Sequence, residues 1–224
     1  MTNALIIHSA TISVGGKLLI ANLDLAVEPG TVATVMGPSG SGKSTLISFI
    51  GGHIDSAFHA TGRVLIGSRD ITDLPPERRG VGILFQDDLL FPHLSVGTNL
   101  AFGLAHSVSG HKARRQHVAE ALAEADLGGF EERDPATLSG GQRARVALMR
   151  TLLAAPKVLL LDEPFSKLDA DLRRDFRRFV FDRALSKQLP VLLVTHDKAD
   201  AQAANGQIVN LGPMPINTIV NHRP

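Results

Sequence analysis

The chain has 224 residues, of which 44% are hydrophobic and 20% charged, as expected for one domain, or one domain with an inserted lobe, around a sizeable core. Its 23 basic and 22 acidic side chains leave a formal net charge of +1, so the composition favours no nucleic-acid partner. The absence of cysteine excludes disulfides and thiolate metal sites. Neither a signal peptide nor a run of about 18 apolar residues is visible, so we expect no transmembrane segment of its own.

Short apolar runs recur along the chain and predict the strands of a sheet. Residues 31–36, 158–161 and 191–194 are apolar at consecutive positions, which is typical of strands buried on both faces of a parallel sheet. Further runs at 5–7 and 81–85 follow the same rhythm, with helical segments between the runs. The pattern predicts an α/β fold with a largely parallel sheet.

The segment 37–45 follows one of these strands and opens a predicted helix. It has the spacing Gly-x-x-x-x-Gly-Lys-Ser/Thr of a phosphate-binding loop. Backbone N–H groups of such a loop bind phosphate at a helix N-terminus, Lys43 is expected to reach the β- and γ-phosphates, and the Ser44 hydroxyl to bind Mg²⁺. A Gly/Ser-rich turn without a ligand would leave the complete motif unexplained. The predicted nucleotide-binding residues are Gly37, Pro38, Ser39, Gly40, Ser41, Gly42, Lys43, Ser44 and Thr45.

Residues 87–154 interrupt the alternation of strands and helices. The segment holds no convincing strand, and 112–126 is predicted to be an amphipathic helix. We interpret 87–154 as a helical lobe inserted into the α/β core. Near its start lie apolar side chains that suit the core of the lobe, namely Leu89, Leu90, Phe91 and Leu94.

A second glycine-rich turn, Leu138-Ser139-Gly140-Gly141-Gln142, lies inside this lobe. Ser139 and Gln142 have the spacing of a capping box before a helix, which is a purely structural interpretation. Two glycines argue for more, because they cost helix stability yet permit close approach of the backbone to a ligand. A helix N-terminus with a serine hydroxyl binds anions. Both interpretations can hold together, since capping aims the N–H donors.

Asp162 and Glu163 follow the apolar run 158–161. Asp162 is therefore expected at the carboxyl end of a buried strand, where ligands of α/β sheets bind, and its carboxylate suits Mg²⁺. Glu163 is placed to orient or deprotonate an attacking water. The alternative, an acidic pair that caps a helix after a core strand, is weakened by the phosphate-binding loop in the same chain.

A further helix is predicted over about 168–187, because apolar side chains such as Leu172 and Phe176 recur there at helical spacing. Arg173 and the neighbouring arginines are most simply its solvated face, since aspartates balance them.

The order and spacing of these motifs resemble those of the ATP-binding subunits of ABC transporters over most of the chain. The turn 138–142 is similar to the signature motif of that family. Gln86 matches the glutamine loop that joins core and helical lobe, and the segment 166–169, called the interface loop below, matches the loop that crosses the dimer interface. His196 matches the switch histidine. Alone, Gln86 and His196 would be better interpreted as a surface amide and a strand-end histidine.

The resemblance implies one ABC ATPase domain over 1–224, with a P-loop NTPase core of RecA-like type over 1–86 and 155–224 and a helical signature subdomain over 87–154. It implies two copies paired head to tail, with each ATP between the phosphate-binding loop of one copy and Ser139, Gly140, Gly141 and Gln142 of the other. The catalytic residues implied are Glu163, His196, Lys43 and Gln86. The Mg²⁺ ligands implied are Ser44, Gln86 and Asp162.

Within the family, the stretch 90–104 resembles bacterial solute importers, such as those serving thiamine, iron, sulfate and polyamine uptake. Residues 134–137 and 142–148, on either side of the signature-like turn, resemble YnjD-type importer ATPases. An importer ATPase is expected to pair with itself or a similar subunit, to bind permease subunits, and to work with a solute-binding protein. The resemblance implies that the apolar residues 89–91 and 94 form part of the groove that receives the membrane subunit, with the core of the lobe as the alternative. It would lie peripherally on the cytoplasmic side of the inner membrane. The alternatives are an exporter ATPase and a soluble ABC-type ATPase of DNA repair or translation.

Two positions depart from the family pattern. Val14 stands where an aromatic side chain usually stacks on adenine, so we hypothesise weak selectivity between ATP and GTP. Lys167 replaces the small residue that is usual in the interface loop, which changes the expected details of the dimer contact.

Overall fold

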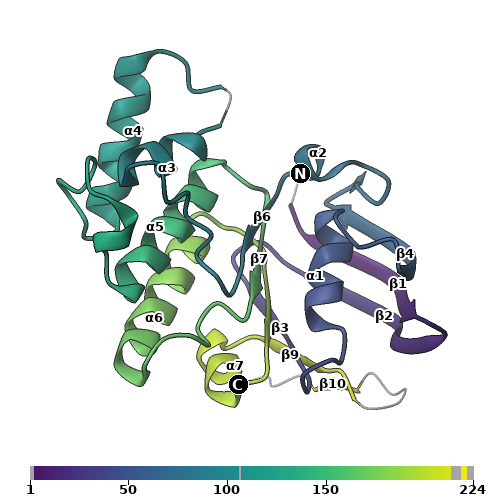
Figure 1. The fold of residues 1–224 in the computed structure, drawn as a ribbon. Helices are drawn as coiled ribbons and strands as arrows, with labels where there is room; N and C mark the ends of the chain where they lie inside the picture. The colour runs from purple at the N-terminus through teal and green to yellow at the C-terminus, as the bar shows by residue number, and fades with distance from the viewer. Residues whose placement is uncertain (1–2, 106, 213–217, 221–224) are drawn as a thin grey trace. The chain divides into compact units, whose positions relative to one another are not determined.

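The computed structural model describes residues 3–105, 107–212 and 218–220 (Figure 1). It divides into two compact units. The first contains residues 1–83, 157–163 and 181–224, and the second contains 84–156 and 164–180. All of 87–154, the predicted helical lobe, lies in the second unit, which also takes in residues 164–180 that the sequence analysis assigned to the core.

The first unit contains an antiparallel sheet that the sequence analysis did not predict. Its strands are β1 (Leu5–Val14), β2 (Lys17–Val27), β4 (Phe58–Ile66) and β5 (Arg69–Asp70), in the order β2-β1-β4-β5. The run 5–7 that was counted with the parallel strands is the start of β1, which pairs antiparallel with both β2 and β4. Buried and exposed residues alternate along much of β2, as in a sheet with one solvated face.

A second, mostly parallel sheet holds the strands predicted from consecutive apolar residues. Its strands are β3 (Val32–Met36), β6 (Val81–Leu84), β7 (Val158–Asp162), β8 (Val191–Thr195), β9 (Gln207–Asn210) and β10 (Thr218–Val220), in the order β10-β9-β3-β8-β7-β6. β8 lies parallel to both β3 and β7, and every residue of β8 is buried. Met36 pairs with Thr195, and Asp162 with Val194, so the carboxyl ends of these three strands meet at one edge.

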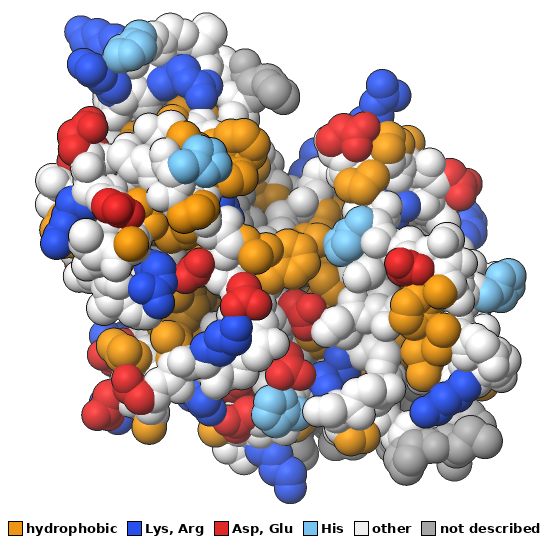
Figure 2. All heavy atoms as spheres, in the orientation of Figure 1, with side chains coloured by type: hydrophobic (Ala, Val, Ile, Leu, Met, Phe, Trp, Pro, Cys, Tyr) orange, Lys and Arg blue, Asp and Glu red, His pale blue; other side chains and the backbone are white. Residues whose placement is uncertain are grey.

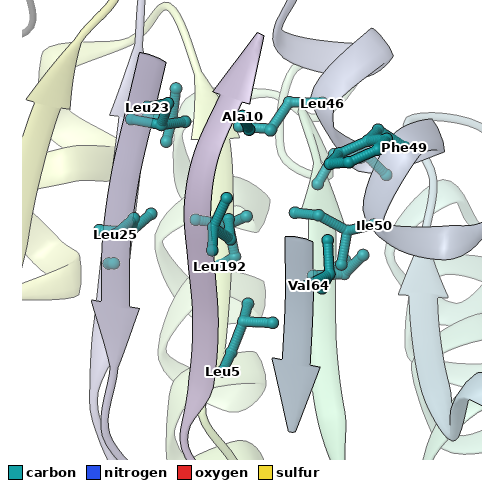
Figure 3. Packing of buried hydrophobic residues seen from close by; sticks show 14 of the residues in the cluster. Leu5, Ala10, Leu23, Leu25, Leu46, Phe49, Ile50, Val64 and Leu192 are labelled. Carbon is teal, nitrogen blue, oxygen red and sulfur yellow. The ribbon is translucent and has the colours of Figure 1, made fainter. Parts of the chain in front are cut away.

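Helix α1 (Lys43–Gly51) joins the core of the first unit to the phosphate-binding loop. Leu46 and Ile50 lie in one buried cluster with Leu5 and Val64 of the antiparallel sheet and Leu192 of β8 (Figure 3). Burial of these side chains contributes on the order of 1.5–3 kcal/mol each. The start of α1 is therefore held rigidly against both sheets. The unit also contains the helices α2 (Pro76–Arg79) and α7 (Lys198–Ala204).

A buried arginine holds the other end of α1. Arg79 is only 6% exposed, and its guanidinium donates to the carbonyl oxygens of Phe49, Ile50, Leu74 and Thr72. Phe49 and Ile50 belong to the last turn of α1, where helix carbonyls lack intrahelical partners. Burial lowers the pKa of the Arg79 guanidinium, and the nearby Asp73 carboxylate opposes that change. Arg79 thus satisfies the carbonyl end of the helix that begins at Lys43.

The second unit is helical. Its helices are α3 (Val96–Phe102), α4 (His111–Glu124), the short 3-10 helix η1 (Pro135–Thr137), α5 (Gly140–Leu153) and the first part of α6 (Ala170–Ser186). The helix predicted over 112–126 corresponds to α4, which packs together with α3 against α5. Over the described ranges, none of the helices combines the length and the apolar character needed to cross a membrane.

Charged side chains of both signs are interspersed on the visible face of each unit (Figure 2). This distribution follows from the nearly equal numbers of basic and acidic residues.

Candidate nucleotide site

The predicted phosphate-binding loop connects β3 to α1. Gly42, the N-cap of α1, has a φ of 92°, a conformation that residues with a Cβ rarely adopt. Gly42 also has no side chain to cap the helix, so the N–H groups of the first turn remain available to a ligand. The described structure leaves the buried Ser41 hydroxyl oxygen without a hydrogen-bond partner. The Ser41 hydroxyl and the N–H groups of the first turn of α1 are therefore suited to bind the oxygens of a phosphate-bearing ligand.

The side chain of Lys43 is 4% exposed and its ammonium group lies inside this loop. Its Nζ donates to the carbonyl oxygens of Gly37, at 2.9 Å, and Pro38, at 3.0 Å. The same Nζ lies 3.4 Å from Oε1 of Glu163. A buried ammonium needs such partners, and phosphate oxygens would be stronger acceptors than carbonyls. The geometry therefore suits a lysine that can give up its hydrogen bonds to the loop carbonyls and bind a phosphate oxygen instead.

Asp162 ends β7 and lies beside the first turn of α1. Ser44 Oγ donates to Asp162 Oδ1 at 2.9 Å. Burial chiefly raises the pKa of Asp162, and the neighbouring Glu163 carboxylate adds to that rise, while the Ser44 hydrogen bond and Lys43 oppose it. A cation at this position would stabilise the ionised form, and hydroxyl and carboxylate oxygens are the ligands that Mg²⁺ prefers. Ser44 and Asp162 thus fit a magnesium ion next to the phosphate-binding loop.

Glu163 follows Asp162 and is held between two other predicted site residues. Its Oε2 lies 2.9 Å from Nδ1 of His196, and its Oε1 faces Lys43. Glu163 has a φ of 46°, in the left-handed region that residues with a side chain rarely adopt. Residues in such conformations cluster at functional sites. The N–H of Glu163 donates to the carbonyl of Val194 on β8, which stabilises this conformation. The structure therefore brings Lys43, Glu163 and His196 together within the first unit.

The turn that presents His196 depends on two residues that the sequence analysis missed. Asp200 is 3% exposed and accepts a hydrogen bond from Thr195 Oγ1 at 3.1 Å. Thr195 Oγ1 in turn accepts from the N–H of Asp197 at 3.0 Å. These bonds fix the backbone on both sides of His196. An aspartate five positions after Thr195 was the available signal, but its partner becomes evident only from the folded chain.

The signature-like turn lies in the second unit at the start of α5. Both hydrogen bonds of the capping box are present, since Ser139 N–H donates to Gln142 Oε1 and Gln142 N–H donates to Ser139 Oγ. At Gly140, an added Cβ would meet only Leu168 Cδ2, at 3.9 Å, and the residue has no left-handed φ. The fold of this chain therefore does not itself require glycine at 140. Close approach of a ligand to the backbone would require it.

Gln86 and the interface loop also lie in the second unit. Gln86 is exposed and lies two residues after the end of β6, separated from the strand by Phe85. Arg173 donates to the carbonyls of Ser166 and Leu168, so it supports the interface loop and is not simply part of a solvated face. Leu172, which was expected on the apolar face of its helix, is 40% exposed. Lys167 forms an ion pair with Asp87.

A family model described as ABC transporter matches residues 20–166. The chain belongs to the ABC transporter family. Among its relatives is the uncharacterized ABC transporter ATP-binding protein YnjD of Escherichia coli (strain K12), which is 50% identical over 185 residues, 83% of this chain and 85% of that protein. The match confirms the family that the motifs predicted, and the chain is an ABC-type ATPase.

Relatives of this ABC ATPase include named importer subunits. The Fe(3+) ions import ATP-binding protein FbpC 1 of Haemophilus influenzae is 41% identical over 92% of the chain, and the sulfate/thiosulfate import ATP-binding protein CysA of Mycobacterium tuberculosis is 43% identical over 90%. The chain spans 62% and 56% of the lengths of these two proteins. No relative named here favours the alternatives, a soluble ABC-type ATPase or an exporter.

A solved structure supports the fold of the ABC ATPase. The ATP-binding cassette MJ0796, in a dimeric post-hydrolysis state bound to ADP and Pi, matches with a TM-score of 0.76 and 29% identity, covering 92% of this chain and 93% of that one. The predicted α/β fold of P-loop NTPase type is therefore confirmed.

Proposed function

We propose that this ABC ATPase is the energy-coupling subunit of a bacterial solute importer, and that it hydrolyses ATP at the interface of a head-to-tail dimer. The observation that carries the proposal is the contact of Glu163 with both Lys43 and His196 beside the phosphate-binding loop. A carboxylate between an ammonium and an imidazole is suited to water activation next to bound phosphate. The iron and sulfate importers among the relatives support the choice of importer.

ATP would be bound by the loop 37–45, whose Ser41 hydroxyl and first-turn N–H groups suit phosphate oxygens. Mg²⁺ would be held by Ser44 and Asp162, which already contact each other, and by Gln86 as the family resemblance implies. The ion would supply positive charge for the phosphate oxygens. Lys43 would leave the carbonyls of Gly37 and Pro38 for the β- and γ-phosphates.

In hydrolysis, Glu163 would orient the attacking water and accept its proton. His196 would keep the Glu163 carboxylate in place through the hydrogen bond seen in the structure and would contact the γ-phosphate from its exposed edge. Charge that develops on the transferred phosphoryl group would be stabilised by Lys43 and by donors from the second copy.

Those second-copy donors would be the Ser139 hydroxyl and the N-terminus of α5, with Gly140, Gly141 and Gln142 around them. The room left at Gly140 supports this arrangement, because the chain alone has no need of glycine there. Loss of the γ-phosphate would weaken the grip of this turn, so ATP would favour the closed dimer and ADP the open one.

The subunit would be bound peripherally to the cytoplasmic side of the inner membrane by permease subunits, and a solute-binding protein would complete the system. Exposed hydrophobic side chains of the second unit, Leu89 at 55% and Phe102 at 69%, support a protein contact there. Phe102 also packs edge-on against Phe91, at 4.8 Å between ring centroids. Of the candidates named from sequence, Leu89 and Phe91 thus lie in or beside this exposed group.

The test is purification of the tagged chain from detergent-solubilised membranes of the cells that naturally produce it. We expect integral membrane proteins to copurify in a fixed ratio and to stimulate or couple ATP hydrolysis by the chain. The matched control is a Leu89→Ser, Phe102→Ser double variant, which should lose the membrane proteins but keep ATP binding. Recovery of the active chain with nucleic acid or ribosomes in place of membrane proteins would contradict the proposal.

A further inference from the structure

We propose that Asp87 and Asp88 are positioning residues that attach the segment after Gln86 to the interface loop on one side and to the signature helix α5 on the other. The inference rests on the proposed function, in which Gln86 and the start of α5 belong to the ATP site and the interface loop crosses the dimer interface that contains it. All of the contacts that carry it lie within the second unit.

Asp87 provides the first attachment. Its carboxylate forms an ion pair with Lys167, which stands in the interface loop eighty positions further along the chain. Both side chains are more than half exposed, at 53% for Lys167 and 64% for Asp87, so the pair contributes little to global stability. The departure from the small residue usual at position 167 is thereby explained, since a small side chain could not reach Asp87.

Asp88 provides the second attachment. Its Oδ2 lies 2.9 Å from Nε of Arg143, and Nη1 of the same guanidinium donates to the carbonyl of Leu138 at 2.9 Å. Leu138 directly precedes Ser139. Arg150, two turns further along α5, donates to the carbonyls of Asp88 and Leu89. Helix α5 therefore contacts the side chain of Asp88 through Arg143 and the backbone of Asp88 and Leu89 through Arg150.

The three segments surround a cavity of about 280 Å³. Asp87 and Asp88 line it from one segment, Gly140 and Arg143 from α5, and Lys167 from the interface loop. Apolar side chains also line this cavity, so the charged pairs add two directed contacts to packing that is partly apolar. Two adjacent aspartates that face different motifs form one short connection between the signature turn and the interface loop.

Hydrogen exchange measures the attachment without requiring activity. In the full-length chain, Asp88→Asn is expected to raise amide exchange in 138–143, and Lys167→Ala in 166–169, by about threefold or more, because local opening then breaks fewer contacts. The matched controls are Asp126→Asn, which removes the other aspartate paired with an α5 arginine, and Arg174→Ala, which removes an exposed pair with Asp171. Exchange in these segments that is unchanged by Asp88→Asn and Lys167→Ala would overturn the proposal.

Kinetics separate positioning from mere stability. Asp88→Asn and Lys167→Ala are expected to lower kcat by roughly three- to tenfold, a loss typical of misplaced supporting groups, while ATP affinity at the loop 37–45 and the Tm stay close to those of the wild type. The exchanged pair Asp87→Lys with Lys167→Asp should recover most of the kcat. Faster exchange with unchanged kcat would overturn the positioning role.

Two further arms keep the test decisive. Should Asp88→Asn fail to fold, Arg143→Lys replaces it, because lysine keeps the charge but cannot bond Asp88 and Leu138 together. If the wild-type chain hydrolyses no ATP, the proposed function fails, while the exchange experiment still reports on the attachment.

Discussion

Lys43 and Glu163 face each other across the candidate site, with Lys43 Nζ 3.4 Å from Glu163 Oε1. The residue expected to bind the γ-phosphate is thus paired with the residue expected to activate water. His196 holds the other oxygen of the same carboxylate. A nucleotide that drew Lys43 to its phosphates would release Oε1 from the ammonium, so nucleotide binding and the readiness of the general base would be linked.

Replacement of Glu163 by glutamine tests its role as the base. Glu163→Gln keeps the size of the side chain and one acceptor oxygen but removes its basicity, so kcat for ATP should fall by roughly 10²–10⁴ while ATP still binds. ATP-bound dimers should then accumulate in gel filtration with Mg²⁺-ATP. The exposed Glu28→Gln serves as control and should behave as the wild type. Undiminished hydrolysis in Glu163→Gln would refute the assignment.

A methyl group at Gly140 tests whether something outside the chain approaches there. Gly140→Ala should fold with little change in Tm, because the added Cβ meets only an ordinary contact with Leu168. Its kcat should fall at least about tenfold, since small displacements at a reacting site are costly. Gly128→Ala is the matched control, because a Cβ there meets nothing within 4 Å. Equal kcat values for the two variants would mean that no ligand approaches Gly140.

Mixing two impaired variants tests whether the site is shared between copies. A heterodimer of Lys43→Ala with Gly140→Ala contains one site in which both defects meet and one site with neither. We expect the mixture to hydrolyse more ATP than the sum of the two variants measured separately, at equal total protein. If each site were built from a single copy, the mixture would show only that sum.

The buried Arg79 is expected to matter for stability. Arg79→Met removes the donor to four carbonyl groups, two of them at the end of α1, and should lower the free energy of unfolding by roughly 3 kcal/mol. Urea denaturation followed by circular dichroism measures the loss. Arg78→Met changes the exposed neighbour and should alter stability by less than about 0.5 kcal/mol. Similar losses in both variants would show that the buried hydrogen bonds are not the cause.

Nucleotide selectivity tests the interpretation of Val14. Val14 ends β1, where it pairs with Lys17 and Phe58 and stays partly exposed. We expect similar kcat/KM for ATP and GTP, and a KM roughly tenfold lower for both nucleotides in Val14→Tyr, because an aromatic ring adds stacking of about 1–3 kcal/mol to either base. Val14→Leu adds apolar volume without a ring and should cause no such fall in KM. A strong ATP preference in the wild type would refute the hypothesis.

Features that depend on neighbouring residues could be predicted from the amino-acid sequence alone. The phosphate-binding loop, the capping box at Ser139 and the buried strands β3, β7 and β8 all follow from local spacing or local hydrophobicity. The motifs also indicated the family, because their order can be read along the chain without knowledge of the fold. The comparison with known proteins confirmed that family.

Contacts between side chains that lie far apart in the sequence became evident only from the folded chain. The alternation in β2 did not reveal that β1, β2 and β4 form a separate antiparallel sheet, because pairing depends on the partner strand and its register. The charge balance around Arg173 predicted a solvated face, whereas the folded chain turns that side chain to the carbonyls of the interface loop. The contacts of Glu163 with Lys43 and His196 required the parallel order of β3, β8 and β7, which brings their carboxyl ends to one edge. The spacing of residues along the chain identifies which chemical groups could form a site. The distances between those groups depend on how the strands pair, and strand pairing depends on the whole fold.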